Sequence, residues 1–429
     1  MRTADPYANA NPILRKRNDH QDLAIPYFSN SNEKGLRPLK KMFSSLSAVL
    51  LLSLVLSGCG TNHAASSGNG EGGGGETLSL GYVGGLSGAT AAFGIPAFDA
   101  VKYAVKEIND NGGILGMKVE LISEDDEGNP FKGQQAIDKM ANQDIQYVIS
   151  GSSSAVALSQ VAKVKENNMI AVSPIASDPA VVSENPRFFV NLANNNQFGW
   201  AAAHYAGKEM GVKEVIAFIR DDAYGTSIYK AFQEKAAELG MNIVQEFKYP
   251  IDAKDFNSYI SQGISSHPDA HIFLSGYAAD SGLIAKQARA LGYDKPLFAT
   301  NPISSPQYYE IAGDASNNTI ISAAYISDAT IGEKTKTFIE AWRKEFNLDP
   351  NVYQVHGYDS VYILKSAIEK AGSVNPEDVQ NALLDVQNFE GASGVTSFNN
   401  DGSATKPIFM VNWDSGKLKL EKILEAGSY

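Results

Sequence analysis

The sequence predicts an α/β fold built from parallel sheets and divided between two lobes. From residue 77 onward, short apolar runs alternate with helical patterns, as in βαβ units around parallel sheets. About 370 residues follow the N-terminal region, which is more than one hydrophobic core usually supports. No change in composition marks a boundary between the lobes. Strands are expected over 78–83, 119–123, 147–149, 170–172, 215–219, 243–247 and 271–274.

Helices are expected between these strands. In the first, Ala97, Val101, Ala104 and Ile108 recur on one face, and the Asn-Gly-Gly at 111–113 ends the helix. The same reasoning places the other helices over 131–142, 155–167, 197–210, 225–239, 256–264, 281–291, 334–346, 358–371 and 376–384.

The N-terminal region is predicted to direct export. Residues 42–58 are 17 uncharged residues that follow Lys40 and Lys41, as in a signal peptide. The segment Leu56-Ser57-Gly58-Cys59 resembles the bacterial lipobox, in which the cysteine receives a lipid and the chain is cut before it. We therefore expect 1–58 to be an extension with a lipoprotein signal peptide and 59–76 to be a Gly/Ser-rich tether. The protein would be extracytoplasmic and lipid-anchored through Cys59 to the outer face of the cell membrane.

Composition and motifs exclude several classes of function. The net charge of -12 disfavours nucleic acid as a partner, and the single cysteine excludes an intrachain disulfide. P-loop, zincin, nucleophile-elbow and dinucleotide motifs are absent, and no histidine pair has metal-ligand spacing. We therefore expect no enzyme, cofactor or metal. The acidic run at 124–127 misses the EF-hand spacing and is predicted to be a solvated loop.

Two hydroxyl-rich loops stand where a ligand would bind. In open parallel sheets, ligands sit beyond the carboxyl ends of the strands. The Ser-Gly-Ser-Ser-Ser at 150–154 follows one predicted strand and leads into a helix, whose N–H groups and dipole favour a carboxylate. A second such turn, 173–179, follows the next strand. Each loop alone is equally consistent with serines that merely cap helices.

Aromatic residues occur in three other strand-end loops. Phe93, Tyr224 and Tyr277 each follow a predicted strand. A buried tyrosine often only completes a core. Together with the two serine loops, however, these aromatics suit a small ligand with one carboxylate and an apolar body.

The chain resembles a known family from residue 78 to residue 424. It is similar to type I extracytoplasmic solute-binding proteins, in particular the branched-chain amino acid (leucine/isoleucine/valine) receptors of ABC importers. The resemblance implies two Rossmann-like lobes joined by three crossings near Ala193, Tyr325 and Thr405. Lobe 1 would comprise 77–193 and 326–405, and lobe 2 would comprise 194–325 and 406–429. The segments that carry the resemblance are Leu86-Ser87-Gly88, Phe93-Gly94, the run from Ile108 to Gly116, Ser173-Pro174, Ala223-Tyr224-Gly225 and Gly357-Tyr358-Asp359.

The resemblance also implies roles for site residues. Ser154 and Ser177 would hold the ligand carboxylate, the backbone of Ile175 would bridge the two ends of an amino acid, and the three aromatics would form a wall. Asn301 departs from the family, because amino acid binders carry there a glutamate that pairs with the ligand ammonium. Since an unpaired buried ammonium is costly, either Asp222 or Asp280 substitutes, or the ligand lacks an amine.

The resulting functional expectation is a substrate-binding lipoprotein of an ABC transporter. It would capture a small carboxylate, with a branched-chain or other hydrophobic amino acid favoured, and deliver it to a membrane permease. Two alternatives stay open: an amine-free ligand, such as an aromatic carboxylate or an amide, and a ligand-sensing lipoprotein without a transport role. A hydrolase using a serine of 152–154 would need a base, and no neighbouring loop offers one.

Overall fold

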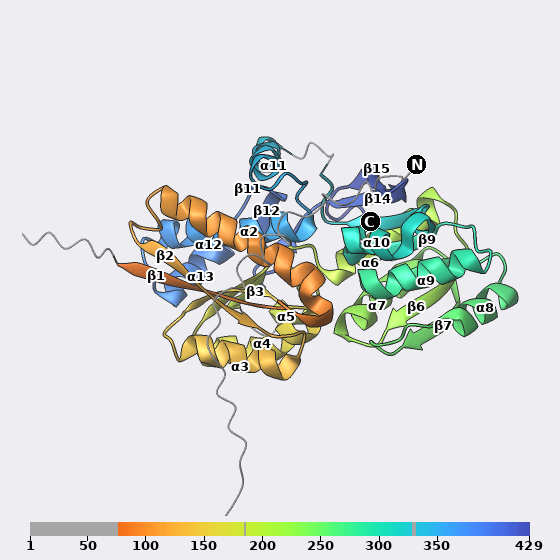
Figure 1. Cartoon of the computed structure of the whole chain (residues 1–429), viewed down its shortest axis with the longest axis horizontal. Helices are drawn as coiled ribbons and strands as arrows, with labels where there is room; N and C mark the ends of the chain where they lie inside the picture. Colours follow the sequence, from red (N-terminus) through yellow and green to blue (C-terminus); the bar gives the residue numbers. More distant parts are fainter. Residues whose placement is uncertain (1–75, 184–185, 328–331) are drawn as a thin grey trace, which may run out of the picture. The chain divides into compact units, whose positions relative to one another are not determined.

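The computed structural model describes residues 76–183, 186–327 and 332–429 (Figure 1). The predicted signal peptide, Cys59 and nearly all of the tether lie outside the described residues. Contacts group residues Gly75–Tyr429 into one compact unit. Within the described part of the chain, no helix combines the length and the apolar character that crossing a bilayer requires.

The first large sheet is entirely parallel. Its strand order is β2-β1-β3-β4-β5, and Figure 1 shows α3 and α4 on one side of it and α2 and α12 on the other. The elements from this part of the chain are β1 (Thr77–Gly84), η1 (Gly88–Thr90), α2 (Ala91–Asp110), β2 (Lys118–Asp125), α3 (Pro130–Ala141), β3 (Tyr147–Gly151), α4 (Ser154–Glu166), β4 (Ile170–Ser173), α5 (Ala180–Ser183) and β5 (Phe188–Val190).

The second large sheet has the order β15-β14-β10-β9-β8-β6-β7. Strands β7, β6, β8, β9 and β10 run parallel to one another. Strands β14 and β15 are antiparallel and extend the sheet beyond β10. The elements from 195 to 323 are α6 (Asn195–His204), η2 (Tyr205–Glu209), β6 (Glu214–Arg220), α7 (Ala223–Glu238), β7 (Asn242–Tyr249), α8 (Asn257–Ser266), β8 (His271–Ser275), α9 (Ala278–Ala290), β9 (Leu297–Thr300), η3 (Asn301–Ser304), α10 (Pro306–Ala312), η4 (Gly313–Ser316) and β10 (Thr319–Ala323).

The rest of the chain first returns to the first sheet and then completes the second. Helix α12 packs along α2 so closely that a Cβ on Gly357 would lie 2.7 Å from the carbonyl oxygen of Ala97. The chain therefore passes between the sheets after β5, after β10 and between β13 and β14. The remaining elements are α11 (Glu333–Phe346), α12 (Val352–Ala371), α13 (Pro376–Leu384), β11 (Phe389–Gly391), β12 (Gly394–Phe398), β13 (Ala404–Thr405), β14 (Ile408–Asp414) and β15 (Lys417–Leu424).

Strand β6 shows why the parallel strands have continuously apolar sequences. Its alternate residues Val215 and Ala217 belong to one hydrophobic core, and Ile216 and Phe218 belong to another. Because successive side chains of a strand point to opposite faces, a parallel strand with helices on both faces must be apolar throughout. The predicted α/β class with parallel sheets is thereby confirmed, with the antiparallel edge as an unforeseen addition.

The prediction that the acidic run at 124–127 is solvated is wrong for Asp126. This residue is fully buried, and its carboxylate accepts hydrogen bonds from Ser152 Oγ at 2.6 Å and from the N–H of Gly128 at 2.7 Å. Burial raises the pKa of the carboxyl group, and the hydrogen bond from Ser152 opposes that rise. Asp126 thus ties the end of β2 to the loop after β3.

A buried lysine anchors the passage from β13 to β14. Lys406 is 2% exposed, and its Nζ donates to Ser393 Oγ at 2.7 Å. Ser393 in turn donates through its hydroxyl and N–H to the carboxylate of Asp359, a residue of α12. Burial lowers the pKa of Lys406 to about 8, and the charge of Asp359 opposes the shift. The network ties this passage to helix α12 through buried side chains.

Because of this lysine, the free energy of unfolding should change with pH in the alkaline range. Between pH 8 and about 10.5, the unfolded chain binds a proton that folded Lys406 has lost, so its contribution to the free energy of unfolding rises with pH. Lys406→Met removes that contribution. Denaturant unfolding at pH 7.5 and pH 10 should therefore show a wild-type advantage over Lys406→Met that grows with pH.

The matched control is Lys370→Met, whose surface pair with Asp385 is exposed on both sides. The difference in free energy of unfolding between the wild type and this control should be nearly the same at pH 7.5 and pH 10. An advantage over Lys406→Met that stayed flat or shrank would contradict the prediction.

Candidate functional site

All seven ligand-binding residues predicted from the sequence line one pocket. The pocket comprises about 310 Å³ of space between the atoms, a volume that includes open solvent, and most of its residues come from loops after strands of the two large sheets. Its lining consists of Phe93, Ser153, Ser154, Ile175, Ser177, Leu192, Tyr224, Tyr277, Asn301, Pro302 and Tyr353. None of these eleven side chains is charged.

The serine side of the pocket is built by the loops after β3 and β4. Ser154 is the first residue of α4, and its Oγ accepts hydrogen bonds from the N–H groups of Ser177 and Asp178, both at 3.3 Å. The hydroxyl hydrogen of Ser154 can therefore donate to a ligand. The N-cap residue Ser153 makes no capping hydrogen bond with its side chain, so the first N–H groups of α4 are not satisfied by that cap.

The position of Ile175 is set by its neighbour Ser173. The N–H of Ile175 donates to Ser173 Oγ at 3.3 Å, and Ser173 Oγ itself donates to the carbonyl oxygen of Ser150 at 2.9 Å. These bonds join the two serine loops to each other. They also leave the carbonyl of Ile175 as the backbone group of that residue most open to a ligand.

The aromatic side of the pocket contains four rings. Tyr224 and Tyr277 stack with centroids 5.0 Å apart, and Phe93 lies 5.6 Å from Tyr277 and 5.8 Å from Tyr353. Burial raises the pKa of Tyr224 and of Tyr277 well above the usual value, so both hydroxyls stay protonated at neutral pH. The rings thus form a neutral, mostly apolar wall.

Tyr353 was not predicted as a site residue. It belongs to the first turn of α12, which begins six residues before the predicted start at 358. The sequence does carry a signal for that earlier start, because Asn351 and Gln354 form a capping box. Recognition of this box would have placed Tyr353 at a helix N-terminus, although not in the pocket.

Asn301 lies where β9 ends and η3 begins. It is 3% exposed, and its Oδ1 accepts a hydrogen bond from the N–H of Ala324 at 2.9 Å. The preceding residue, Thr300, shares a 2.7 Å hydrogen bond with the hydroxyl of Tyr224. The end of β9 therefore holds both a polar and an aromatic wall of the pocket in place.

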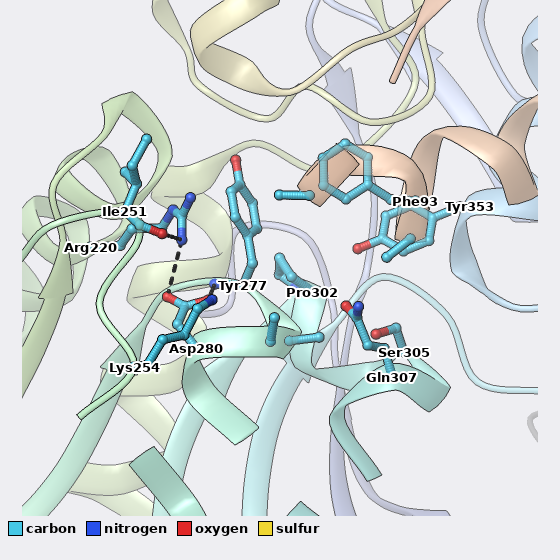
Figure 2. Close-up of a pocket in the computed structure, with 14 residues that line it drawn as sticks. Phe93, Arg220, Ile251, Lys254, Tyr277, Asp280, Pro302, Ser305, Gln307 and Tyr353 are labelled. Carbon is cyan, nitrogen blue, oxygen red and sulfur yellow. Dashed lines mark hydrogen bonds and ion pairs between the residues drawn. The ribbon is translucent and has the colours of Figure 1, made fainter. Parts of the chain in front are cut away.

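A second cavity adjoins the first and contains the charged groups. It comprises about 520 Å³ of space between the atoms, open solvent included, and shares Phe93, Tyr277, Pro302 and Tyr353 with the pocket described above. Figure 2 shows Arg220 and Asp280 on one side of the Tyr277 ring and Phe93 and Tyr353 on the other. The guanidinium carbon of Arg220 lies 4.9 Å from the centroid of the Tyr277 ring.

Arg220 lines this second cavity and compensates two carboxylates, of which only that of Asp280 also lines the cavity. Its Nε donates to Asp222 at 2.7 Å, and its Nη1 lies 3.5 Å from Asp280. Asp222 also caps α7 through the N–H of Gly225, and Asp280 accepts from the hydroxyl of Tyr249 and the N–H of Tyr277. Burial raises the pKa of Asp280, and the charge of Arg220 opposes that rise.

Comparison with known proteins identifies the family. A family model described as periplasmic binding protein matches residues 77–417, which is most of the chain. The chain belongs to the periplasmic binding protein family. Its family and fold are those of extracytoplasmic solute-binding proteins and not of enzymes.

A curated relative and two solved structures are similar to this periplasmic binding protein. The Leu/Ile/Val-binding protein BraC3 of Rhizobium johnstonii is 30% identical over 345 residues, which cover 80% of this chain and 93% of the relative. A leucine-binding protein from Thermotoga maritima superposes with a TM-score of 0.78 at 25% identity, covering 81% of this chain and 99% of that one. An ABC-transporter solute-binding protein from Rhodopseudomonas palustris, in complex with 3,4-dihydroxybenzoic acid, has a TM-score of 0.74 at 21% identity, with 82% and 98% covered.

Removal of Arg220 should destabilise this periplasmic binding protein. Arg220→Met leaves Asp222 and Asp280 without their cation, and breaking a buried ion pair costs about 3–5 kcal/mol. The loss should be larger at pH 8 than at pH 5, because a stranded buried carboxylate raises its pKa and is protonated more readily in acid. Denaturant unfolding at the two pH values measures both effects.

Lys248→Met is the control, since its pair with Asp221 is more than half exposed on both sides. Exposed pairs contribute about 0–1 kcal/mol, so this variant should unfold almost like the wild type. Equal losses for the two variants would show that Arg220 does not compensate buried charge.

Proposed function

We propose that this periplasmic binding protein captures a small solute that carries a carboxylate and an apolar body. The observation that supports the proposal is the meeting of a serine cradle and an aromatic wall in one uncharged pocket. The proposed ligand-binding residues are Phe93, Ser154, Ile175, Ser177, Tyr224, Tyr277 and Asn301. Tyr353 joins them because its ring lies against Phe93.

The serine side suits a carboxylate for a specific physical reason. Ser154 can donate its hydroxyl hydrogen, and the N-terminus of the 13-residue helix α4 adds backbone donors and a positive dipole end. Hydrogen bonds to an ionised acceptor are stronger than those between neutral groups. No covalent step is part of this proposal, because the site contains no activated nucleophile.

The capture mechanism that we propose is closure of two lobes. Lobe 1 would comprise 77–193 and 326–405 and lobe 2 would comprise 194–325 and 406–429, with hinges near Ala193, Tyr325 and Thr405. The pocket residues come from loops of both sheets, so a relative rotation of the lobes would open the site to solvent or enclose the ligand.

The biological role that we propose is delivery of the ligand to the membrane permease of an ABC importer. The similar proteins support this role, since the Rhizobium relative is named for leucine, isoleucine and valine and the Rhodopseudomonas protein is called an ABC-transporter component. We further propose that a lipid on Cys59 holds the protein at the outer face of the cell membrane. Removal of residues 1–58 leaves 28 basic and 44 acidic residues, a charge that favours solubility beside that membrane.

Loss of the serine hydroxyls should weaken ligand binding. A hydrogen bond to a charged group contributes about 1.5–3 kcal/mol, so Ser154→Ala and Ser177→Ala should each raise the Kd about tenfold to a hundredfold. The ligand is first identified by a thermal-shift screen of carboxylates, because a ligand that binds only the native state raises the Tm. Calorimetric titration then gives the Kd of each variant.

Ser159→Ala provides a control on the same helix, since Ser159 Oγ donates to backbone carbonyls and lies outside the pocket lining. Its Kd should match that of the wild type. Unchanged affinity in both Ser154→Ala and Ser177→Ala would refute the assigned carboxylate cradle.

Replacement of Cys59 should release the protein from membranes. Cys59→Ser removes the thiol that would receive the lipid, and stable anchoring of the exported chain would then be lost. Fractionation should find the variant in the soluble fraction, whereas mass spectrometry of the wild type should find a lipid-modified N-terminal cysteine. Membrane-bound wild type that still begins at Met1 with an unmodified thiol would contradict this prediction.

A further inference from the structure

We infer that the ligand is a carboxylate without an amino group and that Asn301 selects against the amine. This inference rests on the proposed function, because it assumes that a carboxylate occupies the serine cradle. It narrows the ligand class, since a hydrophobic amino acid and an amine-free acid of the same skeleton would fill the same pocket. The distinguishing group is the ammonium, which needs negative charge or several acceptors around it when it is buried.

The orientation of the Asn301 amide supports the inference first. Only the carbonyl oxygen of an amide accepts a hydrogen bond, so the N–H of Ala324 fixes Oδ1 toward the backbone of the strand end. Since Asn301 is buried and lines the pocket, its Nδ2 is the end left for a ligand. A donor at this point suits a ligand oxygen, whereas it repels an ammonium, which has only donors to offer.

The pocket lining lacks an acidic side chain, which is a second observation in favour of an amine-free ligand. None of the eleven residues that line the pocket is Asp or Glu. Asp280 is the only acid in the lining of the adjoining cavity. An ammonium near Asn301 would therefore have to draw on Asp280, which lies on the far side of the Tyr277 ring, or on Asp222, which lines neither cavity.

The hydrogen bonds of Asp222 and Asp280 argue against such a role. Asp222 uses one oxygen for Arg220 and the other for the N–H of Gly225 at the start of α7. Asp280 uses one oxygen for the N–H of Tyr277 and the other for the hydroxyl of Tyr249, close to Arg220. Arg220 neutralises one of the two charges, and each of the four carboxylate oxygens already accepts a hydrogen bond from the protein.

The test compares matched acids with and without the amine. Purified protein is titrated in a calorimeter with leucine and 4-methylpentanoate, and with phenylalanine and 3-phenylpropanoate. In whichever skeleton binds, we expect the amine-free acid to bind at least tenfold more tightly. Tighter binding of the amino acid in that skeleton would overturn the inference.

Asn301→Asp provides a nearly isosteric switch. One carboxylate oxygen can keep the hydrogen bond from Ala324, while the other replaces the Nδ2 donor by a negative charge. The variant should shift the ratio of the two Kd values at least tenfold toward the amino acid. An unchanged ratio in a variant with a normal Tm would also overturn the inference, and the wild-type comparison stands even if the variant does not fold.

Asn194→Asp is the matched control for added charge. Asn194 caps α6 and lies outside the pocket lining, and aspartate caps a helix equally well. Its Kd ratio should equal that of the wild type. The same shift in both aspartate variants would mean that Asn301 has no local role.

A further set of ligands tests the proposed carboxylate site independently of the inference about the amine. The neutral amides 4-methylpentanamide and 3-phenylpropanamide are titrated in parallel, and any ligand that copurifies is identified by mass spectrometry after denaturation. Binding of amides without acids, or a copurified ligand that lacks a carboxylate, would refute the carboxylate site itself. Binding of acids with a preference for the amine would refute only the inference about Asn301.

Discussion

Parallel strands end together at one edge of their sheet, and the site of this protein depends on that constraint. Ser154 follows β3, Ser177 follows β4, Tyr224 follows β6, Tyr277 follows β8 and Asn301 follows β9. These residues are far apart in the sequence, yet the hydrogen-bond ladders of the two sheets bring their loops to one pocket. The helices that begin after the same strands then direct their N-termini toward that edge.

Much of the site could be predicted because the pattern of loops after strands is local. The run of serines at 150–154 and the aromatics Tyr224 and Tyr277 directly follow apolar strands, so the sequence alone indicates their edge of the sheet. The seven predicted residues do meet, whereas their contacts with a ligand stay a prediction. The amide orientation of Asn301 could not be predicted, since its partner Ala324 lies 23 positions away beyond the next strand.

Tertiary partners also explain where sequence reasoning failed. An acidic run after a strand resembles a solvated loop, but Asp126 is buried, and Ser152 from the loop after β3, two strands away from β2 in the sheet, supplies a hydroxyl to it. Strand β15 was missed because it has the exposed, charged sequence of an edge strand, whereas β14 was missed although its sequence is an apolar run. Both features depend on contacts between residues that the local sequence does not reveal, and not on local propensity.

The late pairing of β10 has a consequence for how the chain folds. Residues 319–323 form the edge of five parallel strands until 409–413 arrive, about ninety residues later in synthesis. Contacts of such sequence separation slow folding, and an uncovered strand edge can pair with another chain. The edge of β10 in the second sheet therefore stays uncovered until residues 409–413 have been synthesised and have paired with it.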